Sequence, residues 1–108
     1  MPSIPEIDPT ALQKRLDEGD IQLLDVRAAD ERAIVSLGGL HIPITELPER
    51  LDELDEYRDT PLVVYCRSGA RSGQVVRYLQ SMGFTNVHNL KGGTNAWSRE
   101  VDPSLPTY

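Results

Sequence analysis

The stretch that most constrains this chain covers residues 62–72 and reads Leu-Val-Val-Tyr-Cys-Arg-Ser-Gly-Ala-Arg-Ser. Its first four residues are apolar, β-branched or aromatic, which predicts a short buried strand. The single cysteine of the sequence, Cys66, follows this strand at once, and the small residues after it predict a tight loop. Ser72 is expected to cap a helix that runs to about Met82 and ends at Gly83. The stretch therefore predicts a strand, a cysteine loop and a helix in immediate succession.

A loop of this kind can hold an anion beside its cysteine. The backbone N–H groups of the loop can converge on one point, and the first turn of the following helix adds unpaired N–H groups and the positive end of its dipole. We therefore expect a lowered pKa for Cys66, with Arg67 and Arg71 adding positive charge. A lone cysteine at a strand end is more often a small buried residue. Two arginines around a Ser-Gly-Ala turn favour a nucleophile instead.

The rest of the chain alternates apolar strand-like runs with helical patterns. Strands are expected at residues 4–7, 21–26, 40–42 and 87–90, and helices at about 9–18, 28–36, 45–54 and around Trp97. In the helix after the cysteine loop, four residues are expected to face the core: Val75, Val76, Leu79 and Met82. The proline-rich tail, residues 101–108, has no periodicity. This alternation predicts an α/β fold with a largely parallel central sheet and helices on both faces. Cys66 would then lie at the carboxyl end of a strand, where such sheets bind ligands.

Length and composition limit the classes of function that the chain can have. The 108 residues predict one domain, residues 1–108, with a modest core. No run is apolar enough to span a membrane and no export signal is recognisable, so a cytoplasmic protein is expected. The formal net charge of −6 disfavours nucleic-acid binding. Cys66 with His41 and His88 makes a poor metal site, so no metal or other cofactor is expected.

Four segments resemble the single-domain rhodaneses, members of a family of sulfurtransferases that carry sulfur as a cysteine persulfide. The matching segments are Leu24-Asp25-Val26-Arg27 with Glu31, Ile42-Pro43, the cysteine loop at 66–72, and Leu90-Lys-Gly-Gly-Thr-Asn-Ala-Trp97. The resemblance covers nearly the whole chain and implies a rhodanese-like α/β fold. The tail, residues 101–108, is similar to the end of rhodanese domains in enzymes that activate ubiquitin-like sulfur carriers.

The resemblance implies a role for each matching residue. Cys66 accepts sulfur from a small anionic donor such as thiosulfate and passes it to a thiol, to cyanide or to a protein acceptor. Six residues are implied to form its pocket: Arg67, Ser68, Gly69, Ala70, Arg71 and Ser72. Asp25, Arg27 and Glu31 are implied to be structural supports that hold neighbouring strand ends together. With a single cysteine the acceptor must come from outside, and Cys66 is expected to lie near the surface within its reach.

Two alternatives remain open. Cysteine-dependent phosphatases and arsenate reductases also use a cysteine in an anion-binding loop, but the common phosphatase pattern has five residues between the cysteine and its arginine. Here four residues separate Cys66 from Arg71, which tightens the loop. The second alternative is a non-catalytic rhodanese-like binding module, although inactive members typically lack the cysteine. The segment 32–40 departs from the family's usual pattern, which leaves the shape of the pocket undecided.

Overall fold

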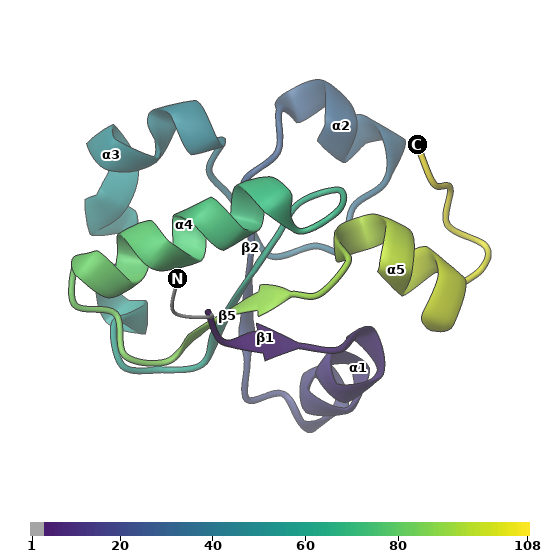
Figure 1. Ribbon diagram of the computed structural model, residues 1–108, viewed down its shortest axis with the longest axis horizontal. Helices are drawn as coiled ribbons and strands as arrows, with labels where there is room; N and C mark the ends of the chain where they lie inside the picture. The colour runs from purple at the N-terminus through teal and green to yellow at the C-terminus, as the bar shows by residue number, and fades with distance from the viewer. Residues whose placement is uncertain (1–3) are drawn as a thin grey trace.

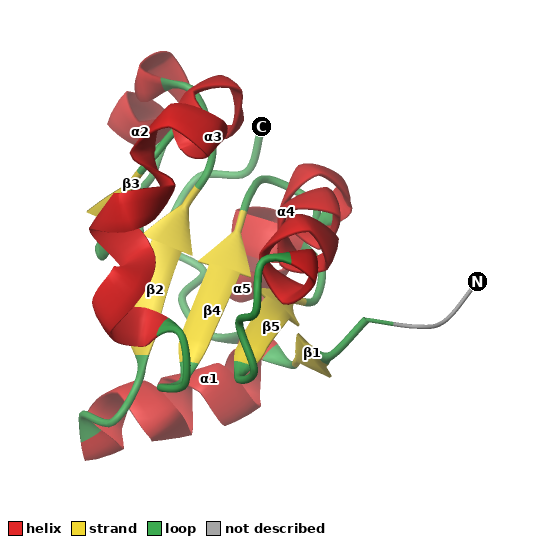
Figure 2. Ribbon diagram, turned by 90° about the vertical axis from the view of Figure 1, so that its left-hand side faces the viewer, coloured by secondary structure: helices red, strands yellow, loops and turns green. Residues whose placement is uncertain are grey.

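The computed structural model describes residues 4–108, which form a five-stranded, wholly parallel sheet (Figures 1 and 2). The strands are β1 (Glu6–Ile7), β2 (Gln22–Asp25), β3 (Leu40–His41), β4 (Leu62–Tyr65) and β5 (Val87–Leu90), in the spatial order β1-β5-β4-β2-β3. The helices are α1 (Pro9–Glu18), α2 (Ala29–Ile34), α3 (Leu47–Arg50), α4 (Ala70–Ser81) and α5 (Gly93–Glu100), with 3-10 turns η1 (Ile44–Glu46) and η2 (Leu51–Tyr57). The predicted α/β fold is confirmed. Within the described residues, every helix is too short or too polar to cross a bilayer.

β4 is the central strand, and its side chains alternate between two apolar layers. Val64 of β4 and Cys66, which lies just beyond the end of the strand, are in a layer that α4 and the α3–η2 segment cover. Val63 and Tyr65 point the other way, into a layer that α1 and α5 cover (Figure 2). Burial of both faces explains why this strand is continuously apolar rather than alternating.

The carboxyl ends of the parallel strands bring distant segments together. The chain leaves β2 into α2 and leaves β4 into the cysteine loop, and both departures lie at the same edge of the sheet. The C-terminal tail returns to this edge, above the arrowheads of β2 and β4 (Figure 2). Residues near 27, 67 and 108 therefore become neighbours.

Three details of the helices differ from the sequence predictions. Helix α4 begins at Ala70, so Ser72 lies inside its first turn and is not the cap. Gly69 precedes the helix with a φ of 101°, a left-handed conformation that turns the loop directly into the helix. Met82 is 42% exposed, whereas Phe84 is buried beyond the end of the helix. The helix expected at 45–54 is α-helical over four residues and otherwise 3-10. Pro48 lacks the N–H that would bond back to Ile44, which accounts for the break between η1 and α3.

The first turn of α5 packs directly on the cysteine loop. The N–H of Thr94 donates to the carbonyl of Cys66 at 2.9 Å. The N–H of Asn95 donates to the carbonyl of Arg67 at 3.1 Å. Gly93 has a φ of 63°, and a Cβ at this position would overlap the backbone of Cys66 and Arg67. The Gly-Gly turn before α5 is therefore what allows the helix to approach the loop so closely.

We predict that Gly93→Ala lowers the free energy of unfolding by about 2–4 kcal/mol, because backbone overlap adds to the cost of a left-handed alanine. Gly38→Ala is the matched control. Gly38 has a φ of 84°, but a Cβ at this position would meet no neighbouring atom within 4 Å, so this variant carries the left-handed cost alone. Urea denaturation of both variants measures the difference. Equal losses would show that the close approach contributes nothing.

Candidate active site

The sulfur of Cys66 lies one residue beyond β4, inside a loop that folds over it. The N–H of Gly69 donates to Sγ at 3.1 Å. Ser72 donates to the same sulfur twice, from its hydroxyl at 3.3 Å and from its N–H at 3.5 Å. Cys66 is 1% exposed, so the expectation that it lies near the surface is wrong. The loop and the first turn of α4 thus place several donors around one buried sulfur.

Burial and hydrogen bonding act on this thiol in opposite directions. Burial raises the pKa of Cys66, because a charged thiolate loses its hydration. The hydroxyl of Ser72 and the backbone N–H groups of Ser72, Gly69 and Ser68 lower the pKa, and together they outweigh burial. The resulting pKa lies below that of an ordinary thiol, as predicted. The lowered pKa of Cys66 is due mainly to these neutral donors, whereas the sequence prediction had also counted on the charges of Arg67 and Arg71.

Asn89 of β5 holds the donors of the loop in position. Its amide Nδ2 donates to the carbonyl of Gly69 at 3.1 Å, and its Oδ1 accepts a hydrogen bond from the hydroxyl of Ser72. A hydroxyl carries one proton, so the bond from Ser72 to the sulfur competes with its bond to Asn89. Sequence reasoning missed Asn89, because its place beside the loop follows from the pairing of β5 with β4.

Asp25 and Arg27 form a completely buried ion pair at the end of β2. Arg27 donates to Asp25 from Nε at 2.9 Å and from Nη2 at 2.8 Å, and both side chains have 0% exposure. The N–H of Arg27 also donates to Asp25, at 2.9 Å, and Nη2 donates to the carbonyl of Val35 at 2.6 Å. The pair therefore connects the end of β2 with the segment after α2, next to the cysteine loop.

Glu31 of α2 pairs with Arg71 of α4. Arg71 donates from Nη2 to Oε1 at 2.7 Å and from Nη1 to Oε2 at 2.8 Å. These bonds lower the pKa of Glu31 to about 2, against a smaller opposing effect of burial. Arg71 thus shares its charge with a carboxylate, a contact that the sequence prediction did not include.

Arg67 projects from the loop onto Tyr108 of the tail. Its side chain is exposed, and its Cζ lies 5.0 Å from the centre of the Tyr108 ring. The hydroxyl of Tyr108 accepts a hydrogen bond from Arg27 Nη1 at 3.0 Å and donates to Glu31 Oε1 at 2.9 Å. Tyr108 is a second residue that sequence reasoning missed, since the aperiodic tail carried no signal beyond its likeness to other rhodanese ends.

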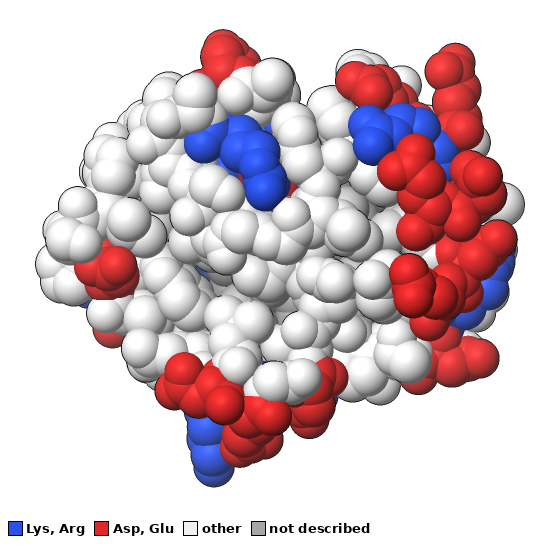
Figure 3. Space-filling model, turned by 180° about the vertical axis from the view of Figure 1, so that it is seen from behind, with Lys and Arg blue, Asp and Glu red and all other residues white. Residues whose placement is uncertain are grey.

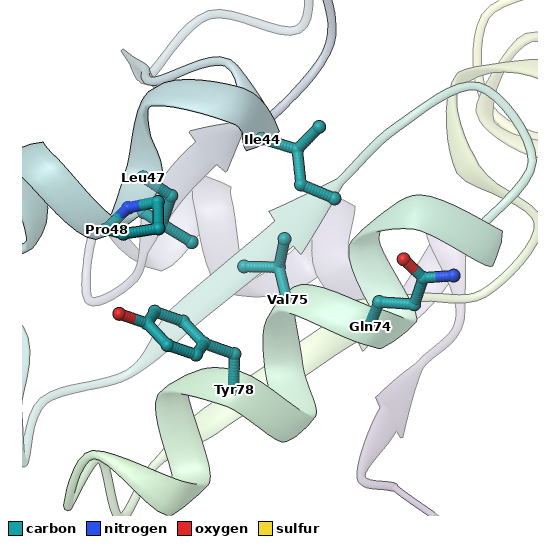
Figure 4. A pocket seen from close by; sticks show the side chains of 6 residues that line it. All are labelled: Ile44, Leu47, Pro48, Gln74, Val75 and Tyr78. Atoms are coloured by element: carbon teal, nitrogen blue, oxygen red, sulfur yellow. The ribbon is translucent and has the colours of Figure 1, made fainter.

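Two other features of the surface are an acidic region and an apolar pocket. Residues 46–59 include seven acidic residues and two arginines. Figure 3 shows acidic side chains gathered over α3 and η2 and around α1. An apolar pocket of about 200 Å³ lies between the η1–α3 segment and α4 (Figure 4), lined by Ile44, Leu47, Pro48, Gln74, Val75 and Tyr78. None of these residues belongs to the predicted anion site, and none carries a charge.

Residues 8–100 of the chain match the rhodanese-like domain family. The chain belongs to the rhodanese-like family. A sulfurtransferase of Allochromatium vinosum is 42% identical over 100 residues, which are 91% of this chain and 92% of that protein. A rhodanese-related protein of Thermoplasma volcanium has a crystal structure that superposes with a TM-score of 0.79 at 30% identity, over 90% of this chain and 93% of that one.

The rhodanese-like chain also matches parts of longer proteins. In the Zea mays adenylyltransferase and sulfurtransferase MOCS3-1, 103 residues are 39% identical, which are 89% of this chain and 22% of that enzyme. The chain spans less than a third of the length of several other curated relatives. The predicted resemblance to single-domain rhodaneses and to the rhodanese domains of such enzymes is confirmed, which supports a rhodanese-type enzyme.

We predict that Ser72→Ala raises the pKa of Cys66 in this rhodanese-like domain, because the thiolate loses the hydroxyl donor. The ultraviolet absorbance of the thiolate, followed against pH, should rise at a higher pH than in the wild type. Ser81→Ala is the matched control, since Ser81 lies on the same helix and bonds the carbonyl of Tyr78 instead. Identical titration curves for Ser72→Ala and the wild type would exclude the role of the hydroxyl.

We predict that Asp25→Ala lowers the free energy of unfolding by about 3–5 kcal/mol, because Arg27 is left buried without its carboxylate. Asp20→Ala removes an exposed pair with Arg15 and should cost less than about 1 kcal/mol. Denaturant unfolding of both variants at neutral pH makes the comparison. A loss for Asp25→Ala as small as that for Asp20→Ala would contradict the structural role of the buried pair.

Proposed function

We propose that this rhodanese-like domain transfers sulfane sulfur through a persulfide on Cys66. The observation that carries the proposal is the convergence of Gly69 and Ser72 donors on the sulfur of the only cysteine. Such donors stabilise a thiolate before the reaction and a negatively charged outer sulfur after it. Membership of the rhodanese-like family supports the same chemistry.

In the first half-reaction the Cys66 thiolate attacks the outer sulfur of a donor such as thiosulfate. A bond forms between Sγ and that sulfur, the sulfur–sulfur bond of thiosulfate breaks, and sulfite leaves with its electron pair. The hydrogen bonds that lower the pKa of Cys66 increase the fraction of thiolate available for this attack. The loop N–H groups then hold the charged end of the persulfide. Because Sγ is buried, the donor enters through the exposed side of the loop at Arg67, Ser68 and Ala70.

In the second half-reaction an external nucleophile removes the outer sulfur. A thiolate or cyanide attacks that sulfur, and Cys66 leaves again as a thiolate. The chain has no second cysteine to act as acceptor. We favour a thiol or a protein acceptor over cyanide, because the chain is similar to a domain of an enzyme named adenylyltransferase and sulfurtransferase. The acidic surface at residues 46–59 favours a protein partner with a basic docking face.

The contacts of Arg71 weigh against a phosphatase. A phosphate dianion needs a guanidinium whose charge is free for it, whereas Arg71 is bound by both oxygens of Glu31. The loop is also one residue shorter than the common phosphatase pattern. A non-catalytic binding module would have no need for the hydrogen bonds that lower the pKa of Cys66. Sulfur transfer is therefore the better account of both observations.

The proposal predicts that the protein gains one sulfur atom at Cys66 on incubation with thiosulfate, and loses it again to cyanide or dithiothreitol. Intact-mass spectrometry before and after each step measures both changes. Cys66→Ser is the control and should gain nothing. An unmodified wild-type mass, with the thiol shown to be free and the protein folded, would refute the persulfide. Isotopically labelled persulfide, offered a thiol and cyanide at equal concentration, then reports which acceptor reacts faster.

A further inference from the structure

Tyr108 lies at the junction of the charged groups around the cysteine loop. Its hydroxyl joins Arg27 to Glu31, with bonds of 3.0 and 2.9 Å. Its ring faces the guanidinium of Arg67, 5.0 Å from Cζ to the ring centre. Its backbone is held by Asn95, whose Oδ1 accepts from the Tyr108 N–H and whose Nδ2 donates to the main-chain oxygen of Tyr108, both at 3.2 Å. A single tail residue is therefore fixed on one side and makes three contacts on the other.

The two arginines of the loop differ in what holds them. Arg71 is bound by the carboxylate of Glu31, which compensates its charge. Within residues 4–108, the guanidinium of Arg67 has no carboxylate within ion-pair distance and lies against the ring of Tyr108. An aromatic face attracts a guanidinium and restricts its motion, yet leaves its positive charge uncompensated. Arg67 is thus held in place and still available to an anion.

We infer that Tyr108 is a positioning residue that holds Arg67 at the mouth of the Cys66 loop, where its charge attracts an anionic sulfur donor. The inference rests on the proposed function, since it names the group that draws the donor to Cys66. The ring carries this role. The hydroxyl of Tyr108 serves Arg27 and Glu31 instead, so the two parts of the side chain can be tested separately.

Alkylation of Cys66 measures the positive charge at the loop without requiring sulfur transfer. Iodoacetate is an anion and iodoacetamide is neutral, and the two have similar size and attack the same thiolate. Because the chain has one cysteine, both rates report on Cys66 alone. The ratio of the iodoacetate rate to the iodoacetamide rate cancels the fraction of thiolate and the accessibility of the buried sulfur. What remains in the ratio is the electrostatic potential at the mouth of the loop.

The expected result is that Arg67→Gln and Tyr108→Leu each lower this ratio by about two- to fivefold. The double variant should show no further fall, because both changes remove the same positioned charge. Tyr108→Phe keeps the ring and should keep the wild-type ratio. Tyr57→Leu is the matched control: Tyr57 bonds Gln22 at the amino end of β2, away from the loop, and its loss should leave the ratio unchanged.

A wild-type ratio in Tyr108→Leu would overturn the inference, as would an unchanged ratio in Arg67→Gln. Such a ratio can arise from equal changes in both alkylation rates, which indicate altered access to the sulfur or an altered fraction of thiolate rather than a displaced charge. Failure of the protein to take up sulfur from thiosulfate would refute the proposed function and leave these ratios intact. The two hypotheses therefore fail by different measurements.

Discussion

The buried ion pair between Asp25 and Arg27 is the interaction on which the carboxyl edge of this sheet depends. Neither side chain reaches water, so the charges depend on ion pairs and fixed hydrogen bonds: Asp25 pairs with Arg27 and also with the partly exposed Arg32. Arg27 directs its other donors to the carbonyls of Glu31 and Val35 and to the hydroxyl of Tyr108. A pair of this kind adds little net stability but permits few arrangements of the groups around it. It therefore specifies how β2, α2 and the tail meet beside the cysteine loop.

The chemistry of Cys66 depends on a balance that the same edge maintains. The core side of the loop removes water from the sulfur, which disfavours the thiolate, while Gly69 and Ser72 supply donors that favour it. In the proposed reaction these donors would be effective because other contacts already hold them in place. Asn89 holds the carbonyl of Gly69, and the first turn of α5 holds the carbonyl of Cys66. A preorganised, partly dry set of dipoles stabilises charge better than water that must reorient during the reaction.

The fold was predictable because its signals are local. The apolar run 62–65 and the helical pattern after it identify β4 and α4, and alternation of such elements implies a parallel sheet. The position of Cys66 at a strand end followed from the same pattern. The partners that complete the site did not, because the contacts of Asn89 and Tyr108 join segments far apart in the sequence, and neither residue belongs to a periodic pattern that would indicate them. To predict the pairing of Arg71 with Glu31, one would also need to know that the ends of β2 and β4 are neighbours.

The two loop arginines and the acidic residues at 46–59 lie in different segments, and their charges would act on different kinds of molecule. At physiological ionic strength charges are screened beyond about 8 Å, so the proposed anionic donor would respond at the loop to Arg67, to the nearby N–H groups and to the Arg71–Glu31 pair. The seven acidic residues at 46–59 have little influence on such a donor unless it passes close to them. The proposed protein acceptor would cover a larger area and meet that surface directly, where many charges act together. A net charge of −6 is therefore compatible with the proposed anionic donor at the loop and the proposed basic partner at the acidic surface, because the two would act over different distances.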